Sequence, residues 1–407
     1  MSDDLLNNIF DNAVKGIQLI KNRKMLTIDY VPDKLFFREE ETTTIAQTLS
    51  VALKGSRPSN LLLFGKPGTG KTAVVKNVIK KFKEKSASLG IEITVTFVNA
   101  KLANTAYKVL YEIAEEMSIN KLETRNQVYF TGLSLGEATN RILDFIKKRK
   151  LHVIFIIDEI DSLVDKNGDD ILYNFTRANE QFLDSGFITL IGVSNSLTFK
   201  DKLDPRVRSS LSEEEIVFNP YKIIQLQKIL KERVKLAFCE NVVTDGAINL
   251  CAAIAGKDNG DARKAIDLLR VASEIAERDK VSQIDEKFIR LAQNKIEKDT
   301  NFEIVKNSTT HTKIVLLAIT KSKNGNTGEV YEIYSKYCKS IDNEPLTQRR
   351  ITQIISELDQ LGLVSSNIVN QGRYGRSQKI RITIPINTLK ESLKDDPLFV
   401  TLINILD

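Results

Sequence analysis

A glycine-rich turn between a short apolar run and a helical pattern constrains this chain more than any other feature. The apolar run Leu61–Phe64 has the length of one buried strand, and apolar residues at helical spacing begin directly after the turn. Between them the sequence fits G-x-x-x-x-G-K-[ST], with Gly65, Gly70, Lys71 and Thr72 at the fixed positions. A strand, a loop and a helix in this order predict a phosphate-binding P-loop rather than an ordinary Gly/Pro turn.

The residue types of this turn suit the binding of a nucleoside triphosphate. Glycines let successive backbone N–H groups converge on phosphate oxygens, and the N-terminus of the following helix adds partial positive charge. Lys71 can reach the β- and γ-phosphates, and the Thr72 hydroxyl can bind Mg²⁺. The predicted nucleotide-binding residues of the turn are Gly65, Lys66, Pro67, Gly68, Thr69, Gly70, Lys71, Thr72 and Ala73.

A second apolar run, Val153–Ile157, ends in two acids, Asp158 and Glu159. Ligands of open α/β sheets bind beyond the carboxyl ends of the strands, so we expect both acids beside the P-loop. Phosphoryl transfer depends on positioning and charge neutralisation. We therefore expect Asp158 to bind Mg²⁺ and Glu159 to polarise the attacking water. Without the P-loop, the same acids would indicate only the start of a solvated helix.

Length and composition limit the number of domains and the class of protein. A chain of 407 residues predicts two or three domains, and its 42% hydrophobic and 28% charged residues are typical of soluble globular proteins. The net charge of +6 permits nucleic-acid binding without requiring it. The sequence shows neither a signal peptide nor an apolar run of about 20 residues, which predicts a cytoplasmic protein with no membrane partner. Three cysteines and two histidines favour neither a disulfide framework nor a zinc site.

The chain divides into three predicted domains. Residues 1–220 contain five strand-like runs that alternate with helical patterns, which favours a parallel sheet with helices on both faces. Residues 221–299 show only helical spacing, and residues 300–407 form a third domain. The polar residues from Lys298 to Thr310 predict a linker between the last two. The five predicted strands are Leu61–Phe64, Ile93–Val98, Val153–Ile157, Phe187–Val193 and Glu215–Phe218.

The third domain predicts a winged helix. Two short helices are expected at His311–Thr320 and Thr327–Ser340, the latter with Thr327 as its N-cap, and a third helix opens near Pro345. Two strand-like runs then flank a basic, glycine-containing hairpin tip. Such a third helix enters the major groove of DNA, although a winged helix that only contacts protein is the alternative. The residues predicted to contact duplex DNA are Gln348, Arg349, Arg350, Gln353, Arg373, Tyr374 and Arg376.

The combined order of motifs resembles the archaeal replication initiators related to the origin recognition complex and the cell-division-control ATPases. The resemblance covers about residues 30–385. It implies an α/β AAA+ P-loop domain with a five-stranded parallel sheet, a helical lid and a C-terminal winged-helix domain. The stretches that carry it are Pro32–Glu39, Gly65–Thr72, Ile156–Asp161, Gly192–Asn195, Leu203–Val207, Pro220–Tyr221, Gly260–Ala265 and Gly372–Arg376.

The resemblance implies roles for residues outside the P-loop. Asn195 is similar to the family's first sensor, which orients the attacking water, and Arg263 to the second sensor, which reports the γ-phosphate to the lid. Tyr221 and Arg233 match positions that line the nucleotide from the lid side. Arg206 resembles an arginine finger offered to a neighbouring subunit.

The connection between Asn99 and Leu151 is much longer than the usual two to six residues of an αβ loop. Its middle part, with Arg125, resembles the initiator-specific insertion that contacts DNA in this family. A plain surface loop is the alternative, although long structured loops are often functional.

Three functions remain open from the sequence. The preferred one is an ATP-dependent DNA replication initiator that binds origin duplex DNA through the winged helix and the insertion. Its ATP/ADP state, with Mg²⁺ and slow hydrolysis, would switch the recruitment of a replicative helicase, with other initiator paralogues as further partners. The alternatives are an ATPase-linked transcription regulator and a clamp-loader-like ATPase that acts on protein. The preferred function places the protein in the cytoplasm, associated with the nucleoid.

Overall fold

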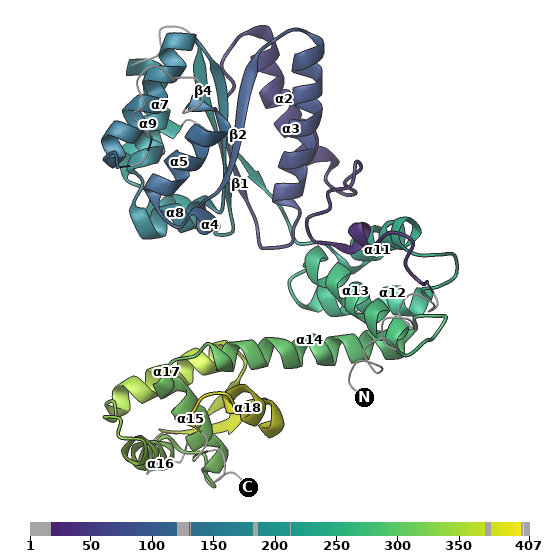
Figure 1. The fold of residues 1–407 in the computed structure, drawn as a ribbon, viewed down its shortest axis with the longest axis vertical. Helices are drawn as coiled ribbons and strands as arrows, with labels where there is room; N and C mark the ends of the chain where they lie inside the picture. The colour runs from purple at the N-terminus through teal and green to yellow at the C-terminus, as the bar shows by residue number, and fades with distance from the viewer. Residues whose placement is uncertain are drawn as a thin grey trace, which may run out of the picture. The chain divides into compact units, whose positions relative to one another are not determined.

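The computed structural model describes residues 18–119, 130, 132–181, 186–211, 213–370, 376–399 and 402. The chain forms two compact units, Met1–Ile289 and Arg290–Asp407 (Figure 1). The first unit holds an α/β base domain and a helical lid, and the second holds the winged helix. Across these ranges, no helix is long and apolar enough to cross a membrane.

A five-stranded parallel sheet forms the base domain, with the strand order β2-β3-β4-β1-β5, as predicted. Phe64 at the end of β1 lies level with Ser194 of β4, and Asn99 at the end of β2 lies level with Asp158 of β3. The carboxyl ends of these strands therefore meet at one edge of the sheet, where the P-loop begins. The strands are β1 Asn60–Phe64, β2 Ile93–Asn99, β3 His152–Asp158, β4 Phe187–Ser194 and β5 Glu213–Val217.

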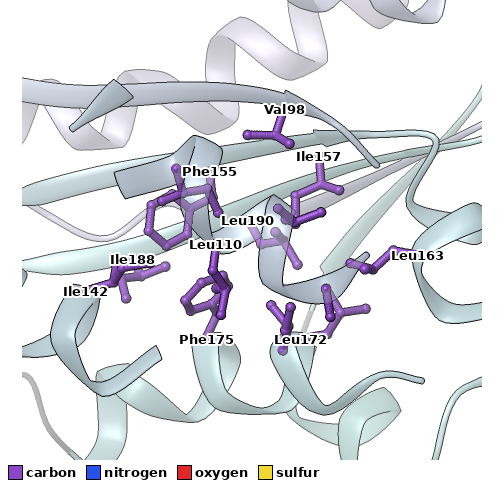
Figure 2. Packing of buried hydrophobic residues seen from close by; sticks show 14 of the residues in the cluster. Val98, Leu110, Ile142, Phe155, Ile157, Leu163, Leu172, Phe175, Ile188 and Leu190 are labelled. Atoms are coloured by element: carbon purple, nitrogen blue, oxygen red, sulfur yellow. The ribbon is translucent and has the colours of Figure 1, made fainter. Parts of the chain in front are cut away.

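Helices cover both faces of this sheet (Figure 1). Along β3, Ile154 and Ile156 pack toward α2 and α3, whereas Phe155 and Ile157 pack into the opposite cluster with α5, α7, α8 and α9. Figure 2 shows this second cluster, in which Phe155 lies among side chains such as Leu110 from the covering helices. Burial on both faces explains why the strand is continuously apolar. The helices of the base are α2 Glu39–Ser50, α3 Lys71–Ser88, α4 Ala100–Ala103, α5 Ala106–Glu116, α7 Leu135–Arg149, α8 Ile160–Asn167, α9 Asp170–Gln181 and α10 Pro205–Leu211, with the 3₁₀ helices η2 Val51–Lys54 and η3 Phe199–Lys202.

The lid is a group of helices that follows β5 in the chain. An N-terminal 3₁₀ helix, η1 Arg23–Leu26, packs against α11 and α13 of this group. Asp261 caps α13, because its side chain accepts hydrogen bonds from the amides of Arg263 and Lys264 at 2.7 and 3.3 Å. The lid helices are α11 Ile223–Ala237, α12 Asp245–Lys257, α13 Ala262–Arg278 and the first part of α14 Glu286–Lys306.

The second unit has the predicted winged-helix arrangement of three helices and an antiparallel hairpin. In the hairpin, Val364 pairs with Ile382 and Asn370 with Arg376. Apolar side chains of α17 line the core with those of α15 and α16. The elements are α15 Thr310–Lys321, α16 Thr327–Ser340, α17 Gln348–Gln360, β6 Val364–Asn370, β7 Arg376–Ile382 and α18 Ile386–Leu393.

Two local predictions are wrong. The expected linker from Lys298 to Thr310 is largely helical, because α14 continues to Lys306 and buries Val305 in the core of the second unit. The N-cap of α16 is Asn326 rather than Thr327, since the Asn326 side chain accepts a hydrogen bond of 2.8 Å from the amide of Glu329.

Candidate nucleotide-binding site and winged-helix surface

The P-loop folds around the amine of Lys71, the first residue of α3. This amine donates hydrogen bonds to the carbonyl oxygens of Gly65 at 2.6 Å and Lys66 at 3.0 Å. It also donates to the side-chain oxygen of Asn195 at 3.0 Å. The structure thus brings together the predicted phosphate lysine and the predicted first sensor, which are 124 residues apart in the sequence.

Lys71 is only 5% exposed, and this burial sets its charge state. Burial lowers the pKa of Lys71 to about 8, while the Asp158 carboxylate opposes the shift and the Arg263 cation adds to it. A buried lysine with a lowered pKa is stabilised in its charged form by an anion that binds nearby. The electrostatics of the loop therefore fit a phosphate group.

Asp158 and Thr72 form the side of the site that fits a divalent cation. The Thr72 hydroxyl donates a hydrogen bond of 3.0 Å to Asp158, whose other oxygen accepts from the amide of Glu159 at 3.0 Å. Hard oxygen donors of this kind suit Mg²⁺, which binds through one or two protein groups together with phosphate and water. Within the described ranges, no cluster of three or more His, Cys, Asp or Glu side chains forms a separate metal site.

Glu159 occupies a strained position directly after β3. Its φ of 53° lies in the left-handed region, which is unfavourable for a residue with a side chain and is frequent at functional sites. Lys101 lies 3.7 Å from the Glu159 carboxylate. The two acids that end the strand thus differ in environment, since Asp158 contacts the P-loop and Glu159 pairs with an exposed amine.

The lid contacts the P-loop through residues near the start of α13 and α11. The amide of Ala262 donates a hydrogen bond of 3.2 Å to the Gly68 carbonyl, and a Cβ on Gly68 would collide with Asp261. A Cβ on Gly70 would lie 2.8 Å from the hydroxyl of Tyr221. Both glycines also have positive φ, so these positions need glycine for space as well as for conformation.

The lid residue Arg263 lies close enough to the P-loop to lower the pKa of Lys71. Its backbone amide is bound by the Asp261 cap. Among the residues that the structure describes, its guanidinium has no hydrogen-bond or ion-pair partner. This cation is therefore free to interact with an added negative charge.

Arg38 is a buried residue of the site that the sequence reasoning did not assign to it. Its Nε donates to the Thr69 carbonyl at 3.0 Å, and its guanidinium lies 4.2 Å from the ring centre of Tyr221. The residue lies in the stretch Pro32–Glu39 that carries part of the family resemblance. Nothing in the spacing of the sequence, however, connects it with a loop 31 residues later.

Arg233 and Arg206 lie outside this immediate contact network. Arg233 is buried and donates to the carbonyls of Met25 at 2.9 Å and Tyr30 at 3.0 Å, so it fixes the N-terminal segment against the lid. Arg206 is exposed on α10, where its guanidinium pairs with Asp204 at 3.0 Å.

On the winged helix, the predicted contact residues Gln348, Arg349, Arg350 and Gln353 are exposed on α17. Arg350 donates to Gln353 at 3.1 Å and pairs with Glu357 at 3.3 Å. The backbone of Arg376 begins β7. The predicted contacts Arg373, Tyr374 and Arg125 lie outside the described residues.

The fold and the site define a AAA+ P-loop ATPase with a helical lid and a C-terminal winged helix. Family models match in the same order: an AAA ATPase domain at residues 61–220, a Cdc6 AAA+ ATPase-type lid domain at 227–294 and a CDC6 C-terminal winged helix domain at 303–392. An ORC1-type DNA replication protein of Thermococcus onnurineus is 42% identical over all of this chain and 98% of its own length. The chain belongs to the family of ORC1-type DNA replication proteins, and the predicted family is confirmed.

Other relatives agree with this assignment. The ORC1-type DNA replication protein of Pyrococcus horikoshii is 44% identical over 93% of this chain and 91% of its own. Among solved structures, the Aeropyrum pernix ORC1 protein in complex with DNA is 40% identical, covers 94% of this chain and 99% of its own, and has a TM-score of 0.81. The Cdc6p structure from Pyrobaculum aerophilum, 23% identical with a TM-score of 0.60 over 95% of this chain and 99% of its own, shares the fold.

Proposed function

We propose that this protein initiates DNA replication by binding origin duplex DNA, with its ATP or ADP state as a slow switch that controls recruitment of a replicative helicase. The observation that carries the nucleotide part is the contact of Lys71 with Asn195, beside the pair of Thr72 and Asp158. In this proposal, the residues at this edge of the sheet would supply the phosphate-binding, water-orienting and cation-binding groups of a P-loop ATPase.

Within this proposal, each side chain has a distinct task. Lys71 and the loop amides bind the β- and γ-phosphates, and Thr72 with Asp158 would hold Mg²⁺, which would neutralise phosphate charge. Glu159 polarises the attacking water, which Asn195 orients. Arg263 would bind the γ-phosphate from the lid. Tyr221 and Arg233 would line the nucleotide from the same side. Arg206 would act on the nucleotide of a neighbouring copy.

The DNA part of the proposal is supported by the exposed polar end of α17 and by the relative from Aeropyrum pernix, whose structure contains DNA. Gln348, Arg349, Arg350 and Gln353 present hydrogen-bonding groups from one end of a helix of the type that enters the major groove. Arg373, Tyr374 and Arg376 of the hairpin and Arg125 of the insertion would add contacts outside this helix.

Footprinting the full chain on its own chromosome tests this function directly. We expect protected sites whose extent differs between ATP and ADP, and we expect the Lys71→Ala variant to lose that difference. A protein that protects no preferred site would instead use its winged helix as a protein-docking module. Helicase recruitment is tested separately, by pull-down of the replicative helicase in ATP and in ADP.

A further inference from the structure

We propose that two hydrogen-bond donors from outside the P-loop, the guanidinium of Arg38 and the backbone amide of Ala262, orient the loop's own amides for phosphate binding. Arg38 is then a positioning residue, because it acts on the nucleotide through the loop. This inference rests on the proposed function, since it requires that the P-loop binds ATP.

The argument starts from the geometry of the peptide group. A trans peptide is planar, and its C=O and N–H bonds point in opposite directions. Arg38 holds the Thr69 carbonyl at 3.0 Å, so the following N–H, that of Gly70, points away from Arg38. Ala262 holds the Gly68 carbonyl at 3.2 Å, which fixes the N–H of Thr69 in the same way.

The carbonyls of Gly65 and Gly70, on either side of these two peptides, accept hydrogen bonds from residues of α3 itself. Lys71 binds the Gly65 carbonyl at 2.6 Å, and the amide of Val74 binds that of Gly70 at 2.9 Å as the first hydrogen bond of α3. The two peptides that Arg38 and Ala262 hold lie between these points. Glycine-rich backbone rotates easily, so losing an outside donor would leave the corresponding amide free to turn away from a phosphate.

Arg38 is itself held rigidly by four contacts besides Thr69. Its guanidinium donates a hydrogen bond of 2.5 Å to the Asn219 carbonyl and pairs with the Glu41 carboxylate at 2.7 Å. The guanidinium carbon also lies 4.2 Å from the ring centre of Tyr221 and 5.4 Å from that of Phe218. A planar guanidinium can stack and donate in several fixed directions at once, whereas a lysine ammonium cannot. The positioning function therefore requires arginine rather than positive charge alone.

These contacts also couple the loop to the lid. Asn219 and Tyr221 lie in the segment that connects β5 to α11, and Ala262 is the first residue of α13. A lid that moved away from the base would break the Ala262 bond, together with the hydrogen bond of 2.5 Å that the Lys66 amine donates to the side-chain oxygen of Asn259 in the lid. Phosphate affinity would then depend on lid position through the orientation of single amides.

The first experiment compares full-length wild type with Arg38→Lys and Arg38→Met. The probes are ATP and AMP in competition with a fluorescent ATP analogue, because AMP lacks the β- and γ-phosphates. We expect both variants to bind ATP about tenfold more weakly, the loss that corresponds to about one hydrogen bond, and AMP affinity to change much less. Unchanged ATP affinity, or an equal loss for ATP and AMP, would overturn the proposal.

The comparison of the two nucleotides separates positioning from damage to the fold. A partly unfolded variant loses affinity for both nucleotides by the same factor, since only the folded fraction binds. Arg270→Met is the matched control for loss of one arginine, because Arg270 pairs with Asp267 and Glu274 within the lid. If wild type itself fails to bind ATP, the proposed function fails. If wild type binds and the Arg38 variants bind equally well, only this inference fails.

A backbone variant tests the second donor without changing any charge. Ala262→Pro removes the N–H at the first position of α13, where proline suits a helix, and the ring Cδ takes the place of the proton, so the Gly68 carbonyl has to turn away from this position. Asp261 has the extended conformation that precedes proline well, with φ −77° and ψ 109°. Ala262→Gly keeps the N–H and is the control. We expect the proline variant to bind ATP several-fold more weakly than the glycine variant. Equal affinities would show that the lid amide does not orient the loop.

Discussion

The amine of Lys71 lies 3.0 Å from the side-chain oxygen of Asn195, so the helix after β1 and the end of β4 share one hydrogen bond at the phosphate site. The strand register explains this contact. Phe64 and Ser194 are paired on parallel strands, so the chain continues from both residues at the same edge of the sheet. The Asn195 oxygen accepts from Lys71, and this leaves the NH₂ group of the side chain to donate to a ligand. This orientation suits an amide that holds a water or a phosphate oxygen.

Removal of the Lys71 amine should weaken ATP binding strongly. In Lys71→Ala we expect a loss of about 2–5 kcal/mol of binding free energy, the range for truncating one partner of a buried charge pair. Lys76→Ala is the matched control, because this lysine of the next turn of α3 lies 4.9 Å from the Phe97 ring, outside the site. Titration with ATP measures both variants, and a Lys71→Ala protein with wild-type affinity would contradict the P-loop assignment.

The lowered pKa of Lys71 predicts that ATP affinity falls at alkaline pH. Below about pH 8 the amine is charged and binds phosphate. Above this pH the Kd for ATP should rise by up to about tenfold per pH unit, because only the charged amine attracts the anion.

The stability of the nucleotide-free protein should increase, rather than fall, as the pH rises through this range. Between about pH 8 and the ordinary value of 10.5 the unfolded chain holds a proton that the folded one lacks, so this residue's contribution to the free energy of unfolding rises with pH.

ATP titrations at a series of pH values and constant ionic strength check this prediction. Lys71→Met serves as the reference, because its residual pH dependence comes from all other groups. A wild-type profile parallel to that of the variant would show that Lys71 does not titrate in this range.

Glu159→Gln should preserve ATP binding and slow hydrolysis by about 10²- to 10⁴-fold, the range for loss of a general base. The amide has nearly the shape of the carboxylate, so the left-handed backbone at this position should persist. Lys101→Met is the control, since it removes the exposed partner of Glu159 but leaves the carboxylate. Phosphate release under single-turnover conditions measures all three proteins, and wild-type turnover in Glu159→Gln would assign the base to another residue.

The sequence predicted the sheet well because parallel strands buried on both faces need continuous apolar runs such as Val153–Ile157. It failed at α14, whose C-terminal part is polar apart from a few residues such as Val305, so the pattern resembled a linker. The start of α16 was misplaced by one residue because Asn326 and Thr327 are both good caps. Only the packing of the folded chain distinguishes them.

The P-loop was equally clear from sequence, because its residues are contiguous and each type has a chemical reason. Arg38 could not be assigned to the site from the sequence, because its positioning function depends on contacts with Thr69 and Asn219, which lie far away in the chain. An arginine before a helix has many ordinary uses. Only the fold shows that this one is buried and bonded to two carbonyls.

Tyr334 should stabilise the start of α17. Its buried hydroxyl contacts His311 Nδ1 at 2.7 Å and accepts from the amide of Leu346 at 3.1 Å, just before the Thr347 cap. Tyr334→Phe leaves that amide without its partner, which we expect to cost about 1–3 kcal/mol of unfolding free energy. Amide hydrogen exchange should show faster exchange at Leu346, and unchanged protection there would mean that the hydroxyl does not hold this segment.

Two arginines of the winged helix should affect DNA binding in different ways. Arg349 is exposed near the start of α17, where a side chain can reach a base edge, so Arg349→Ala should cost about 1–3 kcal/mol on the preferred site and little on other sequences. Arg376 lies in the hairpin, where a phosphate contact is expected. Arg376→Ala should weaken all sequences alike and make the slope of log affinity against log salt shallower by about 0.9.

Binding of the full chain to a footprinted site and to unrelated DNA, each at several salt concentrations, distinguishes these roles. Lys339→Ala is the control, since it removes one exposed positive charge from α16 rather than from α17 or the hairpin. If Arg349→Ala weakens both DNA sequences equally and changes the salt slope, Arg349 contacts phosphate rather than a base. If neither Arg349→Ala nor Arg376→Ala differs from Lys339→Ala, the winged helix does not bind DNA through this face, because each direct contact should release at least one counterion or lose one base-specific bond.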